Sequence, residues 1–224
     1  MKPCKLNTFP VFRTAARTAA RVAALGSLAL LSACSVLPRA EPLDTYLLPP
    51  AHLSHSAAQT SLALSLRIAR PLGGVQLAGQ RIIVVPENNR LSVYKGVSWS
   101  DPAPVLLRDR ILEAFRVDGR IAGLSTDEVR LQADYELVSD LQAFQTEYRD
   151  GVPEVVVRLD ARLVYGNGRR IVASRLFESR HRPAGVEVPQ VVASFGQAST
   201  TVASEMVEWV VAELGRCGAG GCAE

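Results

Sequence analysis

Three carboxylates in the middle of the chain have the residue type and the spacing for acid and base chemistry. Asp134, Glu136 and Asp140 occupy alternate positions of one segment, so they project from one face of a predicted strand. Paired carboxylates can donate and accept protons. The polar residues between them instead indicate a face that meets solvent or a partner, and Arg158 and Arg162 on the next predicted strand can pair with them. We therefore predict a structural role for this face and no catalytic residue.

The three histidines complete no recognisable site. His52 and His55 lie three residues apart in a polar segment with no acid or cysteine beside them, and His181 lies between two arginines. Zinc sites need several such ligands together. The sequence also has no nucleophile elbow, phosphate loop, zinc-protease motif or dinucleotide fingerprint. We predict no metal site, no cofactor and no enzyme activity.

The thiol of Cys34 has the clearest predicted chemistry. It ends the tetrapeptide Leu31-Ser32-Ala33-Cys34, which resembles the bacterial lipobox. In a lipobox, the cysteine sulfur receives a diacylglyceryl group. The small residues that precede the cysteine let the signal peptidase bind the chain in an extended form and cut it before the cysteine. A basic stretch without acids and the apolar run 22–31 precede it, in the order of a secretory signal. The run is shorter than the roughly 20 residues that a permanent membrane span needs.

These features predict a signal peptide at residues 1–33 and a tether at residues 34–42. Finished lipoproteins of this type carry three acyl chains on the cysteine, palmitate among them, which exceeds the roughly two membrane signals needed for stable anchoring. Ser35, rather than aspartate, follows the cysteine. By the sorting rule for such lipoproteins, this favours the inner leaflet of the outer membrane, with the body facing the periplasm.

Two further cysteines lie in a glycine-rich C-terminal tail. Cys217 and Cys222 are separated by Gly-Ala-Gly-Gly within residues 216–224, which we predict to be flexible. In an oxidising compartment they are candidates for a small local disulfide. A metal pair would need closer spacing and further ligands.

The charge of the chain argues against nucleic acid as a partner. Five of the 25 basic residues precede residue 22, and the first acid is Glu41. From residue 34 onward, 20 basic and 22 acidic residues give a formal net charge of −2 (20 minus 22). A nearly neutral body lacks the electrostatic attraction that nucleic acid binding requires. Arg169-Arg170 and Arg180-His181-Arg182 are ordinary turn residues or contacts for phospholipid phosphates.

The elements expected to position these residues begin with short strands. Alternating apolar residues predict strands at residues 44–48, 62–68 and 81–85, with another near residues 91–94. Ser100-Asp101-Pro102 then predicts a helix start, because it combines a capping side chain with a proline. That helix is expected to end at Asp118-Gly119.

The second half of the chain carries the strongest patterns. Residues 131–141, 155–165 and 170–179 alternate and are separated by turn sequences, which predicts an antiparallel meander of three long strands. Pro189 opens a long amphipathic helix that should end near Leu214 and Gly215. The predicted fold class is α+β: a single mostly antiparallel sheet, with two amphipathic helices covering one face. It forms one domain, residues 43–215.

With the signal, tether and order of elements in place, the chain resembles the ABC-type transport auxiliary lipoproteins. A member of this family serves the paraquat-inducible, MCE-type membrane-integrity system. The likeness spans about residues 43–214. One departure is the stretch 72–79, where the family usually has a proline-tyrosine-leucine segment, so a recognition loop there is expected to differ. The segments that carry the likeness are Thr45–Pro49, Arg81–Val85, Leu91–Pro102, Ala133–Phe144 and Val191–Val211.

The resemblance implies a non-catalytic role in lipid traffic beside an ABC permease complex and an MCE-domain protein. It carries no catalytic residues over to this chain. Tyr94 and Trp99 are candidates for partner contact, with core packing as the default for both. Two alternatives remain open: an assembly or secretion lipoprotein with a different envelope partner, and a direct lipid carrier with an apolar cavity between sheet and helices.

Overall fold

The computed structural model describes residues 43–53, 61–87, 90–129, 131–167 and 170–220. The chain from Leu43 onward forms one compact unit. Its strands and helices follow in the order β1 (Asp44–Tyr46), β2 (Leu62–Ile68), β3 (Leu72–Gly73), β4 (Ile83–Val85), β5 (Ser92–Val93), β6 (Val97–Trp99), α2 (Ala103–Asp118), β7 (Ile121–Thr126), β8 (Tyr135–Arg149), β9 (Val152–Tyr165), β10 (Arg170–His181) and α3 (Val188–Gly220).

The predicted meander of three long antiparallel strands is confirmed. Strand β9 pairs antiparallel with β8 on one side and with β10 on the other. The β8–β9 turn consists of Asp150 and Gly151, whose φ angles are 51° and 74°. Two successive positive φ angles fit the right-handed twist of a tight hairpin.

The prediction of a mostly antiparallel sheet needs correction, because the sheet is mixed. Strands β2, β3 and β4 all run parallel to β8 and pair with successive parts of it, and β7 runs parallel to β2. The strand order is β10-β9-β8-β2-β7. Strand β9 pairs with one edge of β8, so β2, β3 and β4 pair with its other edge. The connections between these short strands set their parallel direction. The prediction of a single sheet also needs correction, because β1 and β6 form a separate two-stranded parallel sheet.

The first long strand begins later than its sequence pattern predicts. It starts at Tyr135 rather than near residue 131 and continues to Arg149. A bulge between Leu141 and Ala143 shifts the register, and such a bulge adds an unpaired residue to one strand. Buried side chains therefore change parity, from Leu137 and Leu141 before the bulge to Phe144 and Thr146 after it.

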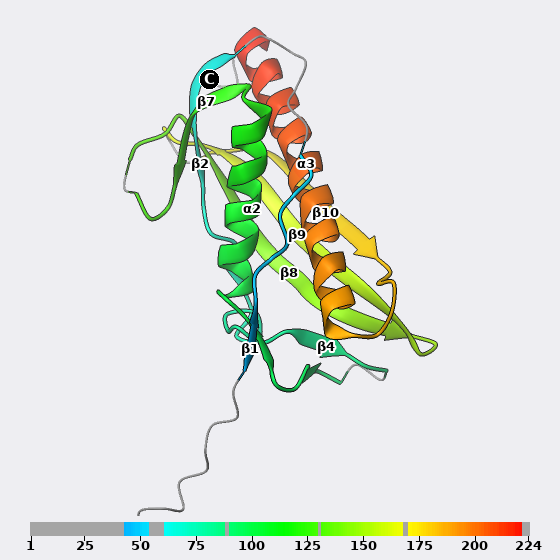
Figure 1. Cartoon of the computed structure of the whole chain (residues 1–224). Coiled ribbons are helices and arrows are strands. Elements are labelled where there is room, and N and C mark those ends of the chain that lie inside the picture. The colour runs from blue at the N-terminus through cyan, green and yellow to red at the C-terminus, as the bar shows by residue number, and fades with distance from the viewer. Residues whose placement is uncertain (1–42, 54–60, 88–89, 130, 168–169, 221–224) are drawn as a thin grey trace, which may run out of the picture. The chain divides into compact units, whose positions relative to one another are not determined.

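Helices α2 and α3 lie side by side over one face of the sheet (Figure 1). Helix α2 begins after Pro102 and ends at Gly119, whose φ of 78° closes it in a left-handed cap, as predicted. The helices bury apolar stripes against the sheet. The members on α2 are Leu107, Ile111, Ala114 and Phe115, and those on α3 are Phe195, Ala198, Val202, Met206 and Val210.

Helix α3 extends beyond its predicted end. It continues through Gly215 to Gly220, so residues 216–220 of the expected flexible tail are helical. Arg216 forms an ion pair with Glu213, one turn earlier, and Cys217 is buried. Because a glycine weakens a helix by only about 1 kcal/mol, these contacts are sufficient to carry the helix past it.

Residues 47–53, here called the crossing segment, run over the groove between the two helices (Figure 1). The guanidinium of Arg110 on α2 donates hydrogen bonds to the carbonyl oxygen of Pro49 and, at 3.4 Å, to Thr200 Oγ1 on α3. Pro49 also lies against Gly196, where an added Cβ would come within 2.9 Å of the Pro49 Cβ. The segment therefore needs a residue without a side chain at position 196.

Replacing Gly196 by alanine is expected to loosen this crossing. A second substitution in the same helix, Gly215→Ala, adds a methyl group where nothing lies within 4 Å. Both changes gain the same helix propensity, so their difference isolates the contact with Pro49. We expect Gly196→Ala to be about 1–3 kcal/mol less stable than Gly215→Ala by denaturant unfolding. Equal stabilities would contradict close packing of the segment.

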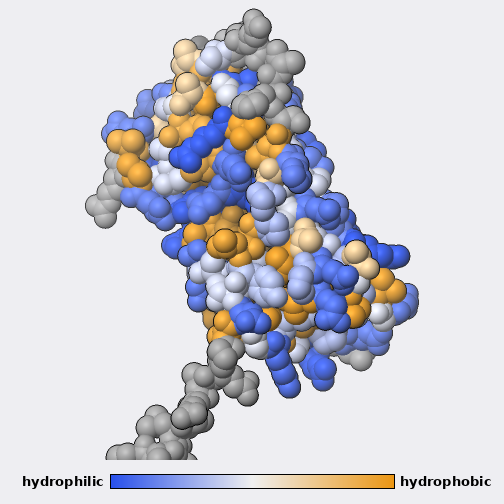
Figure 2. All heavy atoms as spheres, in the orientation of Figure 1, coloured by the Kyte–Doolittle hydropathy of each residue, from blue (hydrophilic) through white to orange (hydrophobic). Residues whose placement is uncertain are grey.

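Hydrophobic side chains also reach the surface, interleaved with hydrophilic ones (Figure 2). Three large apolar side chains among the described residues are more than 70% exposed: Val75 at 92%, Leu47 at 74% and Leu72 at 73%. They lie in two segments that are distant in sequence, the crossing segment and the stretch that departs from the family pattern.

Candidate functional site

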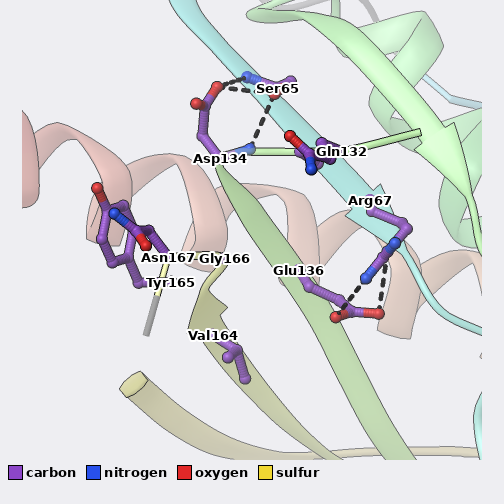
Figure 3. A pocket seen from close by; sticks show the side chains of 10 residues that line it. Ser65, Arg67, Gln132, Asp134, Glu136, Val164, Tyr165, Gly166 and Asn167 are labelled. Carbon is purple, nitrogen blue, oxygen red and sulfur yellow. Dashed lines mark hydrogen bonds and ion pairs between the residues drawn. The ribbon is translucent and has the colours of Figure 1, made fainter. Parts of the chain in front are cut away.

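A polar pocket of about 510 Å³ lies where β8 begins, beside β2 and the end of β9. Figure 3 shows side chains from three strands around it. Gly166, after β9, donates a backbone hydrogen bond of 2.8 Å to the carbonyl of Asp134 and closes one side. Asp134 and Glu136, two of the carboxylates considered for acid and base chemistry, both line this pocket.

Asp134 is held by Ser65 on β2 (Figure 3). The backbone N–H and the hydroxyl of Ser65 both donate to Asp134 Oδ2 at 2.7 Å, and the backbone N–H of Asp134 donates to Ser65 Oγ at 2.9 Å. Hydrogen bonds from Ser65 lower the pKa of Asp134. A carboxylate with a lowered pKa is a weak base. The arrangement therefore ties β2 to β8 rather than activating the serine.

Glu136 is held by the neighbouring residue pair. Arg67 donates from Nε to Glu136 Oε1 at 3.1 Å and from Nη2 to Oε2 at 2.8 Å, a two-point contact between directly paired positions of β2 and β8. The hydrogen bond to Glu136 raises the pKa of Arg67. The charges of Arg67 and Glu136 thus neutralise each other, and the pocket is further lined by the Asp134 carboxylate and by neutral polar groups such as Gln132 and Asn167.

The Ser65–Asp134 contact predicts a specific pH dependence of stability. The pKa of Asp134 is lower in the folded protein than in the unfolded chain, where it is about 4. Its contribution is therefore present above that pH and is lost as the pH falls through the lower, folded value. The stability difference between the parent and Asp134→Asn, from urea unfolding, should be largest near neutral pH and shrink in acid.

Ser65→Ala supplies the control for this measurement. It removes the hydroxyl donor, so the effect of Asp134→Asn should be smaller in the Ser65→Ala background than in the parent. A pH-independent difference, or one unchanged by Ser65→Ala, would contradict the assigned contact.

The sheet face opposite the helices carries further ion pairs. Arg162 contacts Asp140 at 2.6 Å and Asp160 at 2.9 Å, which confirms the predicted pairing between Arg162 and Asp140. Arg158 instead pairs with Glu178 on β10. The partners of Asp134 and Glu136 on β2 were not predictable, because no local pattern in the sequence indicates that β2 lies beside β8. The structural role predicted for this face agrees with these contacts.

Trp99 and Tyr94, the two candidates for partner contact, differ in how deeply they are buried. The Trp99 side chain is 1% exposed, and its ring lies 5.2 Å from the Phe195 ring and 5.8 Å from the Phe144 ring, centroid to centroid. Trp99 therefore has the default packing role. Tyr94 is half-buried against the core, and burial raises its pKa to about 12. Partner contact through Tyr94 stays a prediction.

The remaining candidates are separated or lie outside the described residues. His52 and His181 line a second pocket of about 420 Å³ beside α3, together with Pro49 and Thr200. Within the described ranges, no three histidine, cysteine or acidic side chains cluster as metal ligands. Cys34, His55 and Cys222 lie outside those ranges, so the lipidation and the disulfide stay predictions.

None of the helices in the described ranges combines the length and the apolar character needed to cross a bilayer.

Comparison with known proteins places the chain in a family. The family model of the ABC-type transport auxiliary lipoprotein component matches residues 46–207. An uncharacterized protein of Bradyrhizobium diazoefficiens is 34% identical over 155 residues, which cover 69% of this chain and 41% of that relative. The match thus spans less than half the length of the relative.

Solved structures share the fold. A crystal structure of a Xanthomonas campestris protein is similar with a TM-score of 0.73 and 28% identity, covering 78% of this chain and 98% of that one. Another, of an uncharacterized protein, has a TM-score of 0.57 and 16% identity, covers 76% of this chain and 99% of that one, and shows the fold alone. Since the family model covers most of the chain, the chain belongs to the family of ABC-type transport auxiliary lipoprotein components.

Proposed function

We propose that this protein is an outer-membrane-anchored, periplasm-facing accessory lipoprotein of an MCE-type ABC lipid transport system. Its role is to dock and position other subunits without catalysis. The observation that carries the proposal is the family match over residues 46–207. The lipobox at Cys34 and the following Ser35 support the anchor and its membrane. The partners are an MCE-domain protein and an ABC permease complex.

The proposed docking surface is the outer edge of β10 with the adjoining sheet face. In the described residues β10 pairs with β9 alone, so its other edge presents backbone donors and acceptors. Ile171 and Leu176 are both 55% exposed on this strand. Proteins commonly bind an extended partner segment by adding it to such an edge. Arg158 and Arg180 beside this edge are already ion-paired, which favours backbone and apolar contacts over new ion pairs with them.

The proposal assigns the space between the sheet and the helices to the core rather than to a lipid cargo. Val157, Leu159 and Val202 are completely buried there. The polar pocket at the start of β8 does not suit acyl chains either. These observations favour a docking role over direct lipid carriage.

Affinity purification of the full-length acylated protein from gently solubilised membranes tests the proposal. Mass spectrometry should identify an MCE-domain protein and its permease among the copurifying proteins. Recovery of only an outer-membrane barrel or a secretion pore would overturn the proposal in favour of an assembly or secretion role.

A matched pair of variants tests the docking surface. Leu176→Gln alters the edge strand, whereas Leu131→Gln alters a similarly exposed leucine before β8. The first variant should recover less of the partner complex than the parent, and the second should recover as much. Equal recovery from both would place docking elsewhere.

A further inference from the structure

The most exposed apolar side chains gather where the folded chain emerges from the predicted tether. Leu43 is the first described residue, and Asp44 next to it donates a backbone hydrogen bond of 2.9 Å to Gly96. Tyr46 accepts one of 2.8 Å from the backbone N–H of Ser100, just before α2. Leu47, 74% exposed, is the next residue. These contacts fix the start of the chain beside the N-terminal end of α2.

The stretch 72–79 reaches the same end of the molecule from another direction. A Cβ on Gly73 would lie 3.5 Å from Pro104 in the first turn of α2. The loop is closed by backbone bonds from Leu77 and Ala78 to Gly74. Gln80, which follows it, accepts a backbone bond of 2.7 Å from Trp99. The loop thus holds the exposed Leu72 and Val75 near the start of the chain.

We call the surface of Leu43, Leu47, Leu72 and Val75 the tether end. It lies at the lower end of the view in Figure 1, around β1, and Figure 2 shows hydrophobic side chains there. Leu77, buried beneath the loop, anchors it to the core. The loop therefore presents Leu72 and Val75 from a fixed base, although neither side chain contributes to the core.

We propose that the tether end contacts the lipid surface to which the protein is anchored, with Leu72 and Val75 entering the interfacial region. The inference rests on the anchor at Cys34 in the proposed function. The nine residues 34–42 reach at most about 30 Å even when fully extended. Because the acyl anchor would already hold the protein at the membrane, contact of the tether end with the same membrane is intramolecular and has a high effective concentration. A weak apolar contact is therefore sufficient.

The charge of the tether end favours apolar insertion over electrostatic attraction. Lys95 and Arg81 are exposed there, and so are Asp44 and Asp101. These opposite charges balance, so anionic lipid gains little from approaching. The contact is therefore expected to depend on burial of Leu72 and Val75 and to persist when the salt concentration is raised.

Tryptophan placed on the surface tests the contact in the full acylated protein. Val75→Trp puts the probe in the loop, and Leu131→Trp puts it before β8 at a residue that is 58% exposed. The native Trp99 and Trp209 are buried, and their signal is subtracted with the parent protein. In vesicles of phosphatidylethanolamine and phosphatidylglycerol with nitroxide-labelled lipid, the probe at position 75 should shift to the blue and be quenched. The probe at position 131 should show neither effect.

Vesicle binding of an unanchored form gives a second measure. In a form that begins at Ser35, and so carries neither the signal nor the acyl chains, Leu72→Asn with Val75→Asn should weaken binding to the same vesicles by about tenfold. Leu131→Asn should leave it unchanged. Equal quenching at positions 75 and 131, or unchanged binding of the double variant, would overturn the inference.

The outcomes separate this inference from the proposed function. If the protein is acylated and recovers the transporter but position 75 is not quenched, the lipid contact fails and the proposed function stands. If the protein is not acylated, the proposed anchoring fails, and vesicle binding of the double variant still decides the lipid contact. If the double variant binds vesicles normally yet loses the transporter, the tether end is a protein-docking surface and the lipid contact is wrong.

Discussion

Cys34→Ala is expected to abolish acylation and delivery to the outer membrane. Without the thiol, no diacylglyceryl group can be attached, so the cut before the cysteine does not follow and residues 1–33 stay on the protein. Each buried methylene of an acyl chain contributes about 0.8 kcal/mol to membrane binding, and this contribution is lost with the chains. Density-gradient separation of the two membranes, followed by blotting, measures the loss from the outer membrane. Intact mass should show a lipid adduct on the parent alone.

Ser35→Asp provides the matched control. It keeps the thiol and changes the residue that directs sorting, so the protein should stay acylated but move to the inner membrane. Density-gradient separation of the two membranes reports this shift. A Cys34→Ala protein that loses its signal and reaches the outer membrane at the parent level would contradict the lipoprotein assignment.

Trp99→Ala is expected to cost about 3–5 kcal/mol of the free energy of unfolding. Trp99 joins three parts of the core, because it lies on β6 and its ring contacts Phe144 on β8 and Phe195 on α3. Removing it leaves a cavity and two aromatic rings without their edge-to-face partner. Guanidinium unfolding followed by circular dichroism gives the difference, with Trp209 as a remaining fluorescence probe.

Leu91→Ala is the control for this prediction. Leu91 is half-exposed and lies shortly before the same strand, so its loss should change the free energy of unfolding by less than about 0.5 kcal/mol. Trp99→Phe keeps an aromatic ring and should fall between the two. A cost below about 1 kcal/mol for Trp99→Ala would show that the ring is not a central part of the core.

The sequence by itself determined the strongly periodic elements, and it alone carries the predicted chemistry of the N-terminal segment. The meander was predictable because each long strand alternates polar and apolar residues and is separated from the next by turn residues. The boundaries of α2 were predictable because Pro102 and Gly119 mark its start and its end. The resemblance to the family rested on several sequence segments and on their order along the chain. Local patterns were sufficient wherever a single segment carried the information.

Only the tertiary structure decided which distant segments meet. The parallel pairing of β2, β3 and β4 with β8 depends on residues about 60–70 positions apart, and no local pattern records the partner or its direction. For the same reason, the Ser65–Asp134 and Arg67–Glu136 contacts were not predictable. The bulge after Leu141 reverses which side chains face the core, and only the pairing with β9 reveals it.

The tether end is a second case in which the structure brings together residues that are distant in the sequence. The sequence places Leu47 and Val75 in separate apolar or glycine-rich stretches, each unremarkable alone. The structure brings them to one end of the molecule, because β1 pairs with β6 and the loop after β3 lies against the first turn of α2. The sequence fixes the type of each residue. Long-range contacts between the segments that carry these residues fix the surface that they form together.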